Sequence, residues 1–423
     1  MNRSIIPLPS NLIPDDNSGR LTRLARKLVH NQLSKIKTGE IVFRENHNEY
    51  YFGSVTDDFP VRVYIDANHP SIYTDVAFGG SAGSGEAYMK GSWSCSDLVG
   101  LVRIFLRNRE VLDTMDYGFT RLKAPIHKLL HVLNRNTRTG SKKNISAHYD
   151  IGNDLFKLFL DDTMMYSSAY YEKAEMSLGK AAIAKLDLVC KKLDLQPQDH
   201  LLEIGTGWGG LALHAARNYG CKVTTTTISD EQYQLASQRI KDEGLDHRVT
   251  VLKQDYRDLS GQYDKLVSIE MIEAIGHQYM NAYFEKCCSL LKPDGLMLIQ
   301  AITIKDQLYK SALKDVDFIK KYIFPGGFLP SIEAMSRAIS NYTDMKIFHL
   351  QDIGPHYART LKDWRERFLN KLEEIRELGY SDEFIRLWEY YFCYCEGGFM
   401  ERDIGTVQLL LSRPENRREP VIV

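Results

Sequence analysis

The sequence predicts an α/β protein whose larger part is a doubly wound, mostly parallel seven-stranded sheet with a helical insertion, preceded by a small α+β domain. Three observations predict this fold. Short apolar runs alternate with helical patterns from residue 145 onward, as strands and helices do in a parallel sheet. A glycine-rich turn within 199–210 joins one such run to a helix. A polar, basic stretch at 134–144 lacks apolar periodicity and is expected to be a linker.

The N-terminal domain is expected to span 1–133, because a chain of 423 residues exceeds the size of one typical core. In chain order we expect a basic helix at 20–37, short strands within 40–75, a glycine-rich turn at 79–85, and helices at 96–107 and 118–133. The first helix carries several basic residues and no acid. Such a helix can lie on anionic lipid, but an ordinary packed helix with a solvated basic face fits the pattern too.

The second domain is expected to span 145–423. Its apolar runs and helical patterns predict strands at 200–204, 222–227, 249–253, 264–269 and 296–302, and helices at 209–219, 229–243 and 278–290. Two further runs, at 346–350 and 406–412, predict an antiparallel edge of the sheet. The helical residues between them, 360–401, are expected to be an insertion that covers the edge of the sheet where ligands bind.

The composition argues against several classes of function. The formal net charge is -1, so no global field attracts nucleic acid, and attraction to an anionic surface must come from local clusters. No stretch approaches the ~20 apolar residues of a membrane span. Prolines and aspartates interrupt the first residues, where a signal peptide needs an apolar core. The 7 cysteines lack the spacing of a metal site and predict free thiols in a reducing cytosol.

The glycine-rich turn is the strongest chemical signal in the sequence. Gly205, Gly207 and Gly209 follow a predicted strand and precede a predicted helix, so the backbone can turn sharply and approach a ligand closely. The helix that follows offers free backbone amides at its N-terminus. The glycine spacing is not the dinucleotide pattern, and the next strand ends in 224–229 without an acid for a ribose. With Glu203 just before the first glycine, the turn predicts a site for S-adenosylmethionine.

Many motifs, in order along the chain, resemble those of the cyclopropane-fatty-acyl-phospholipid synthase family, which includes the mycolic acid cyclopropane synthases. The resemblance covers roughly 145–412 and reaches into the first domain. The motifs that carry it are Gly85–Trp93, His148–Asp150, Gly152–Phe156, Tyr166-Ser167, Glu203–Gly209, Thr227–Ser229, Gln254–Asp258, Lys321–Gly327 and Trp364–Phe368.

The resemblance implies a class I methyltransferase that moves a methyl group from S-adenosylmethionine to a cis double bond of an unsaturated phospholipid acyl chain. Methylation leaves a carbocation, and loss of a proton from the added methyl group closes a cyclopropane ring. In this family a bound bicarbonate ion is thought to accept that proton. Loss of a proton from a neighbouring carbon gives a methyl- or methylene-branched chain instead, and the sequence leaves the choice between these products open.

The resemblance also implies the residues of the site. The expected contacts of S-adenosylmethionine are Tyr166, Ser167, Gly205, Gly207, Thr227, Ile228, Gln232 and Asp255, with Trp208 lining the same cleft. The expected contacts of bicarbonate are Ser168, Glu273, Gln300, Ile302 and Tyr357, and Cys395 matches a family cysteine near them.

Two of these positions depart from the family pattern. Ser168 stands where cysteine is common, and Gln300 stands where histidine is common. Serine keeps the backbone N–H, and glutamine still offers a donor and an acceptor, but glutamine cannot carry a proton as histidine can. Anion binding is therefore expected to be easier to preserve than proton transfer through position 300.

Plainer interpretations compete with the catalytic ones. Glu273 follows a predicted strand and can be a helix cap or a solvated charge, and Tyr357 can be a core tyrosine with a satisfied hydroxyl. Cys395 lies in an aromatic helix, where buried cysteines are usually small hydrophobes. If Glu273 is catalytic, Glu273→Gln should impair turnover more than cofactor binding.

The leading hypothesis is a cytoplasmic, peripheral enzyme that acts on phospholipids at the inner face of the membrane and can self-associate. The basic residues of 20–37 and 134–144 would supply weak electrostatic docking. A methyltransferase for a soluble small molecule is a second hypothesis. A non-catalytic protein that binds lipid or cofactor is a third, motivated by Ser168 and Gln300.

Overall fold

The computed structural model describes residues 19–117 and 152–419, and the predicted linker and the predicted helix at 118–133 lie outside these ranges. The described residues form two compact units, which we describe separately. Unit 1 combines the N-terminal residues with two later segments, 316–323 and 361–403, and unit 2 contains the rest.

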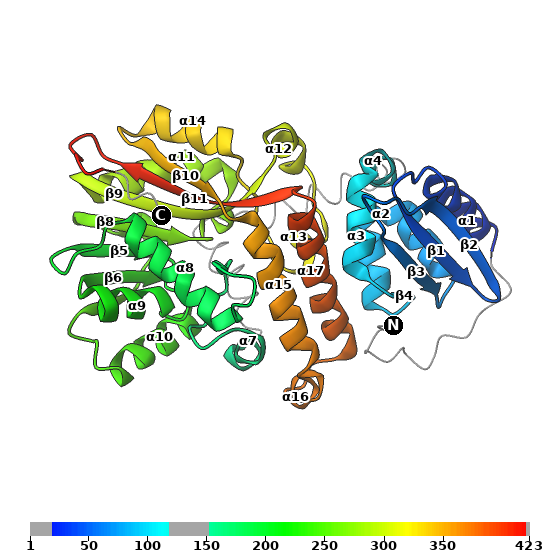
Figure 1. The fold of residues 1–423 in the computed structure, drawn as a ribbon, viewed down its shortest axis with the longest axis horizontal. Coiled ribbons are helices and arrows are strands. Elements are labelled where there is room, and N and C mark those ends of the chain that lie inside the picture. Colours follow the sequence, from blue (N-terminus) through cyan, green and yellow to red (C-terminus); the bar gives the residue numbers. More distant parts are fainter. Residues whose placement is uncertain (1–18, 118–151, 420–423) are drawn as a thin grey trace. The chain divides into compact units, whose positions relative to one another are not determined.

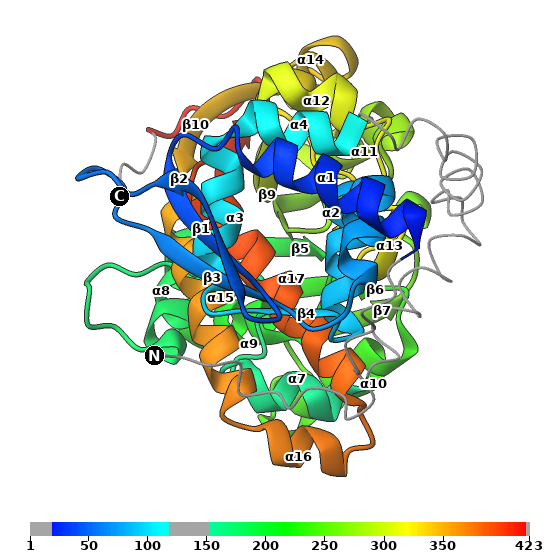
Figure 2. The ribbon, with the colours of Figure 1, turned by 90° about the vertical axis from the view of Figure 1, so that its right-hand side faces the viewer.

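Unit 1 contains a four-stranded sheet in the order β2-β1-β3-β4 (Figures 1 and 2). Its strands are β1 (Gly39–Glu45), β2 (Asn48–Ser54), β3 (Arg62–Ala67) and β4 (Trp93–Cys95). Its helices are α1 (Arg20–Leu33), α2 (Ser71–Met89), α3 (Leu98–Arg107), α4 (Arg109–Tyr117), α13 (Phe318–Tyr322), α16 (Leu372–Glu377) and α17 (Asp382–Met400), with the last part of α15 (Gly354–Leu369). The predicted basic helix, the short strands and the α+β character of this part are present.

The helix α1 packs beside α2 (Figure 2). Ala25, Val29 and Leu33 recur at the four-residue spacing of one helical face, and all three are buried. They join a core that includes Ile41 and Phe43 from β1. The apolar face of the helix thus explains its packing, and the opposite face is left to solvent.

The glycine-rich stretch at 79–85 is not the predicted turn. It lies within α2, and Gly80, at φ 59, kinks the helix there. A Cβ on Gly85 would lie 2.4 Å from the ring of Phe318 and 3.0 Å from that of Tyr390. The glycine is therefore explained by close packing of helices, which the local sequence does not distinguish from a turn.

The division of the chain also differs from the predicted 145–423 domain, because α13, α16 and α17 belong to unit 1. Polar contacts join α17 and its end to the N-terminal helices. Tyr88 donates a hydrogen bond to Glu389 over 2.7 Å, and Arg103 pairs with Glu401 at 2.7 Å. The predicted insertion at 360–401 is thus helical, but its described contacts place it in the core of unit 1.

Unit 2 is built on a seven-stranded sheet in the order β10-β11-β9-β8-β5-β6-β7 (Figure 1). The strands are β5 (His200–Ile204), β6 (Lys222–Thr227), β7 (Val249–Lys253), β8 (Tyr263–Ile269), β9 (Leu291–Ile304), β10 (Lys346–Asp352) and β11 (Ile404–Ser412). The strands from β9 to β7 are mutually parallel, and β11 runs antiparallel to both of its neighbours. This topology confirms the predicted sheet and its antiparallel edge.

Helices cover both faces of this sheet. The α-helices of unit 2 are α7 (Asn153–Phe159), α8 (Leu178–Lys192), α9 (Gly210–Tyr219), α10 (Asp230–Asp242), α11 (Met280–Ser289), α12 (Asp306–Ala312), α14 (Ile332–Tyr342) and the first part of α15. Short 3-10 turns are η2 (Tyr256–Asp258), η3 (Ile272–Ala274) and η4 (His277–Tyr279). Alternation along β5 decides which face each side chain reaches. Leu201 packs with residues of α8 and α9, whereas Leu202 packs with residues of α11 and α14.

Candidate active site

The glycine-rich turn follows β5 at the carboxyl edge of the sheet. Gly205, Gly207 and Gly209 have φ values of 101, 51 and 86°, in the region that favours glycine. The N–H groups of Gly205 and Thr206 both donate to Thr226 O, at 3.1 and 3.0 Å. The helix α9 begins directly after this turn, so its N-terminus lies beside the turn.

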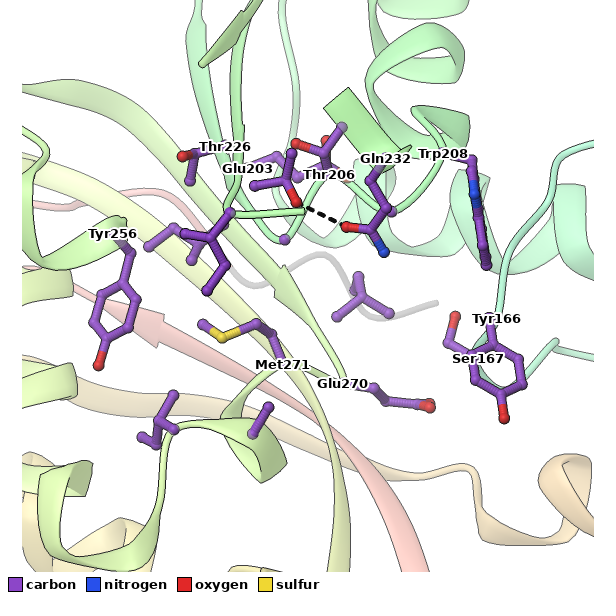
Figure 3. A pocket seen from close by; sticks show the side chains of 18 of the residues that line it. Tyr166, Ser167, Glu203, Thr206, Trp208, Thr226, Gln232, Tyr256, Glu270 and Met271 are labelled. Atoms are coloured by element: carbon purple, nitrogen blue, oxygen red, sulfur yellow. Dashed lines mark hydrogen bonds between the residues drawn. The ribbon is translucent and has the colours of Figure 1, made fainter. Parts of the chain in front are cut away.

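A pocket opens at this edge, where β5 lies between β6 and β8. Figure 3 shows side chains from all of these strand ends around it. All nine residues predicted from the sequence to contact S-adenosylmethionine line the pocket: Tyr166, Ser167, Gly205, Gly207, Trp208, Thr227, Ile228, Gln232 and Asp255. No protein atom would lie within 4 Å of a Cβ added to Gly207, so the space beside this backbone is open. The described residues therefore fit a cofactor of this kind.

Aromatic rings build one wall of the pocket. The ring of Phe156 lies 4.9 Å from that of Trp208 and 5.2 Å from that of Tyr166, measured between centroids. Trp208 Nε1 donates a hydrogen bond to Asn153 Oδ1 at 2.7 Å. Because α7 supplies both Phe156 and Asn153, this helix fixes the orientation of Trp208.

Polar side chains also line the pocket. Thr227 Oγ1 donates to Gln232 Oε1 at 2.8 Å, a bond that is drawn in Figure 3. Ser229 caps α10 by accepting from the N–H of Gln232. Asp255 binds the guanidinium of Arg257, with 2.6 Å between Oδ2 and Nη2. These contacts fix polar groups that a ligand in the pocket would meet.

Glu270 is the main residue that the sequence interpretation missed. It follows β8, lines the pocket, and extends toward Ser167 and Tyr166 (Figure 3). Its carboxylate accepts a hydrogen bond from Ser168 N at 3.0 Å and one from Gln300 Nε2 at 2.8 Å, both on Oε1, and one from Tyr357 Oη at 2.7 Å on Oε2. Three residues that were predicted to hold bicarbonate thus hold this side chain.

The other two predicted bicarbonate contacts bind each other. Ile302 N donates to Glu273 Oε1 at 2.6 Å, while Glu273 Oε2 is buried without a hydrogen-bond partner among the described residues. Together with the donors that Glu270 uses, this leaves no convergent set of donors for a separate anion among the described residues of the site. The arrangement therefore does not fit a bound bicarbonate, because a carboxylate of the chain occupies its predicted contacts.

The two departures from the family pattern have a structural explanation. Ser168 contributes its backbone N–H to Glu270, while its hydroxyl donates to Ala169 O at 3.0 Å. Gln300 contributes its amide N–H to the same carboxylate. Neither position needs to transfer a proton in this arrangement, so serine and glutamine serve as hydrogen-bonding residues.

Burial and nearby charges set the protonation of the two glutamates. Burial raises the pKa of Glu270, although the bonds from Gln300 and Tyr357 oppose this rise. Burial, together with the nearby charge of Glu270, raises the pKa of Glu273 to about 8. Glu273 is therefore mainly protonated at neutral pH, and Glu270 is better stabilised as a carboxylate.

A buried lysine lies next to this site. Lys185 on α8 donates to Ser167 Oγ at 2.9 Å, and burial lowers its pKa to about 8 while Glu270 opposes the shift. Glu203, at the end of β5, is also buried, and this raises its pKa to about 8 although Thr225 donates a hydrogen bond to it. Acids and a base with perturbed pKa values are typical of functional sites.

Cys395 is the one predicted catalytic residue outside unit 2. It lies on α17 in unit 1, and burial raises the pKa of its thiol. A raised pKa keeps the thiol protonated and makes it a poor nucleophile. Its proposed place near the anion site stays a prediction.

One signal in the sequence could have identified Glu270. Glu270 and Glu273 both follow the same buried strand, and either can reach the carboxyl edge of the sheet. The family resemblance implied a role for Glu273 and none for Glu270. Glu270 follows the last residue of β8 directly, so its position in the sequence already favoured a place at this edge of the sheet.

Comparisons with known proteins support the assignment of the family. The chain matches the model of the mycolic acid cyclopropane synthetase family over residues 136–409. It is 38% identical over 356 residues to cyclopropane-fatty-acyl-phospholipid synthase of Escherichia coli, covering 82% of this chain and 87% of that protein. It is 37% identical over 341 residues to tuberculostearic acid methyltransferase UfaA1 of Mycobacterium tuberculosis, covering 79% of each.

Solved structures agree. The cyclopropane synthase MmaA2 from Mycobacterium tuberculosis superposes with a TM-score of 0.60 at 31% identity, covering 64% of this chain and 98% of that one. The mycolic acid cyclopropane synthase CmaA1, complexed with SAH and CTAB, has the same TM-score at 32% identity and the same coverage. The chain belongs to the mycolic acid cyclopropane synthetase family and is an S-adenosylmethionine-dependent methyltransferase of the cyclopropane-fatty-acyl-phospholipid synthase type.

Proposed function

We propose that this enzyme methylates a cis double bond in the acyl chain of an unsaturated phospholipid, and that Glu270 accepts the proton that leaves the product. One observation carries the second part of the proposal. Glu270 lines the pocket of the predicted cofactor contacts, and its carboxylate is held by Ser168, Gln300 and Tyr357. A base fixed at the edge of the pocket is what a reaction through a carbocation requires.

The chemistry follows from these positions. S-adenosylmethionine supplies the methyl group, and addition of that group to one alkene carbon leaves a positive charge on the other. The carboxylate of Glu270 stabilises this charge in a site of low dielectric. Oε1 or Oε2 then takes a proton from the substrate, and the electrons of the broken C–H bond neutralise the cation. Tyr357 and Gln300 keep the base oriented.

Which proton leaves decides the product. Loss from the added methyl group closes a cyclopropane ring, whereas loss from a neighbouring carbon gives a branched, unsaturated chain. A saturated methyl branch additionally needs a reductant. The cyclopropane synthase of E. coli and the tuberculostearic acid methyltransferase of M. tuberculosis are almost equally similar to this chain. We propose the cyclopropane as the product and the branched chain as the alternative.

The function is tested with the purified protein, S-adenosylmethionine and vesicles of a monounsaturated phosphatidylglycerol. We expect release of S-adenosylhomocysteine and a lipid that has gained the mass of one methylene group. Proton NMR of that lipid separates ring protons from branch protons. No mass gain, with folded protein that binds S-adenosylmethionine, would contradict the proposal. Turnover of a soluble acceptor only, or cofactor binding without turnover, would favour the two other hypotheses.

Bicarbonate should be dispensable for this enzyme, and Glu270→Gly tests why. Glu270 has φ 49, so a glycine suits the backbone at this position. Removal of the Glu270 side chain leaves the donors of Ser168, Gln300 and Tyr357 in place. We expect the wild type to be unaffected by removal of bicarbonate, and Glu270→Gly to be inactive until formate or bicarbonate restores activity by about tenfold or more. Loss of wild-type activity on removal of bicarbonate would refute this assignment.

Contact with the membrane is proposed for the exposed face of α1. Leu21 and Leu24 are 59% and 54% exposed, although both are large and apolar. Arg20, Arg23 and Lys27 are exposed on the same helix, and no ion pair joins them to an acid within the described residues. Apolar side chains flanked by cations that pair with no described acid suit the surface of an anionic bilayer at the inner face of the membrane. We define these five residues as the docking face.

Removal of the cations tests the docking face. The triple variant Arg20→Gln, Arg23→Gln, Lys27→Gln should bind vesicles rich in phosphatidylglycerol about 100-fold more weakly in a sedimentation assay, while S-adenosylmethionine affinity is unchanged. The matched control carries Lys222→Gln, Lys241→Gln and Lys346→Gln, three exposed lysines of unit 2. Equal loss of vesicle binding in both variants would show that only net charge matters.

A further inference from the structure

We propose that Lys192 is a positioning residue that acts on Glu270 through the side-chain amides of Gln408 and Gln300. The inference rests on the proposed role of Glu270 as the base. It assigns a role to a buried lysine that lies outside the pocket and that no predicted cofactor contact involves.

A continuous chain of hydrogen bonds joins these four residues. Lys192 Nζ, on α8, donates to Gln408 Oε1 at 2.7 Å and also to Gln351 Oε1. Gln408 Nε2 donates to Gln300 Oε1 at 3.0 Å, and Gln300 Nε2 donates to Glu270 Oε1 at 2.8 Å. Gln408 and Gln300 face each other as register partners of the antiparallel strands β11 and β9. Every bond in the chain therefore points from the ammonium toward the carboxylate.

The ammonium fixes the direction of the chain. A glutamine amide has nearly the same shape in its two flipped orientations, so its neighbours decide which end is the donor. A charged lysine donates hydrogen bonds and accepts none. Gln408 must therefore turn its oxygen to Lys192 and its N–H to Gln300. Gln300 must then turn its own N–H to Glu270, and the carbonyl of Ser168 favours the same orientation at 3.4 Å.

Burial of Lys192 and the two glutamines costs free energy, because polar groups lose their contact with water. Lys192 is 1% exposed, and Gln300 and Gln408 are each fully buried. Apolar side chains would fill the same interior without the penalty of desolvating an ammonium group. Aligned amides in such a dry environment extend the effect of the positive charge to the carboxylate. Lys192 is therefore expected to stabilise the charged form of Glu270 from a distance.

Other groups also interact with Glu270 and Lys192, the two ends of the hydrogen-bond chain. Lys185 from α8, Tyr357 from α15 and Glu273 from η3 all interact with Glu270, and they remain in place when Lys192 is replaced. His349 from β10 interacts with Lys192. Burial lowers the pKa of Lys192 to about 8. The effect of Lys192 on Glu270 is thus expected mainly below that pH, where the ammonium is charged.

The direction of the pH effect follows. A base works when deprotonated, so the rate rises with pH through the pKa of Glu270. Removal of the ammonium destabilises the carboxylate and raises this pKa. For Lys192→Met we expect the acidic limb of the pH–kcat profile to move upward by about one pH unit, so that activity falls about tenfold at low pH and recovers at higher pH.

Lys265→Met is the matched control. Lys265 is also a buried lysine of unit 2, but its Nζ donates to Leu193 O at 2.6 Å and has no contact with the chain of amides. Loss of a buried cation should lower the stability of both variants, and only Lys192→Met should displace the pH profile. Gln408→Leu breaks the chain at its second link and should give the same displacement as Lys192→Met, with no further displacement in the double variant.

Infrared spectroscopy separates this inference from the function that it rests on. The pH titration of the protonated carboxyl band that is lost in Glu270→Gln reports the pKa of Glu270 without turnover. A higher midpoint in Lys192→Met than in Lys265→Met supports the inference, even if Glu270→Gln proves fully active and the proposed base is wrong. Equal midpoints in the two lysine variants would overturn it, whatever the pH–kcat profiles show.

Discussion

Glu270→Gln is expected to lower the rate of product formation by about 10²- to 10⁴-fold at neutral pH, with S-adenosylmethionine affinity changed by less than about threefold. Glutamine has nearly the same size. Its oxygen can still accept from Ser168 N and Gln300 Nε2, and its amide N–H can donate to the hydroxyl of Tyr357, so the pocket keeps its shape. The amide cannot take a proton and carries no charge to stabilise a carbocation. Single-turnover assays of the methylated lipid and calorimetry of cofactor binding measure the two effects.

Glu273→Gln is the matched control for this prediction. The pKa of Glu273 is raised to about 8, so the native side chain is mainly neutral at pH 7, and glutamine can keep the bond from Ile302 N. We expect a loss of activity of about tenfold or less. The sequence interpretation expected Glu273→Gln to be the damaging change, and the structure transfers that expectation to Glu270. A larger loss for Glu273→Gln than for Glu270→Gln would reverse the assignment of the base.

Gly207→Val is expected to weaken S-adenosylmethionine binding by about 100-fold or more. Gly207 lines the pocket at φ 51, and the space where its side chain would begin is free of protein atoms. A valine there occupies space that the cofactor needs, and its branched side chain also strains the left-handed backbone. Isothermal titration with S-adenosylhomocysteine measures the loss.

Gly244→Val separates these two causes. Gly244 follows α10 outside the pocket, has φ 65, and also has no atom within 4 Å of an added Cβ. Backbone strain should lower the free energy of unfolding of Gly244→Val by about 1–2 kcal/mol, as in Gly207→Val. Gly244→Val should keep the cofactor affinity of the wild type. If both variants lose affinity equally, strain in unit 2 rather than occupation of the pocket explains the effect.

The larger fold could be predicted because its signals are local. The strands at 200–204, 222–227 and 249–253 match β5, β6 and β7 in their bounds, since each is a short run of apolar or β-branched residues between turn signals. The glycine-rich turn is equally local, because positive φ values require glycine wherever they occur. The topology of a parallel sheet then brings the ends of these strands and the segments after them to one edge, which is why seven of the nine predicted cofactor contacts share one pocket; Tyr166 and Ser167 reach it from the segment before α8.

Features that depend on distant partners were predicted less well. The glycines of 79–85 resemble a turn, and only the close approach of Phe318 and Tyr390 to Gly85 explains why a glycine stands at that position of the helix. The assignment of 361–403 to unit 1 likewise depends on packing against residues far away in the sequence. Local propensity does not contain the identity of such partners.

The sequence by itself determined the methyl donor, the sheet and the edge of the sheet where the chemistry occurs, because each of these follows from short-range backbone requirements and from the order of the strands. The tertiary structure alone identified the side chain that we propose as the base. Position 270 reads as one of two acids after a strand, and its role emerges only where Ser168, Gln300 and Tyr357 meet it from three other segments. Hydrogen bonds between distant residues leave no periodic trace in a sequence, so only the fold could reveal them.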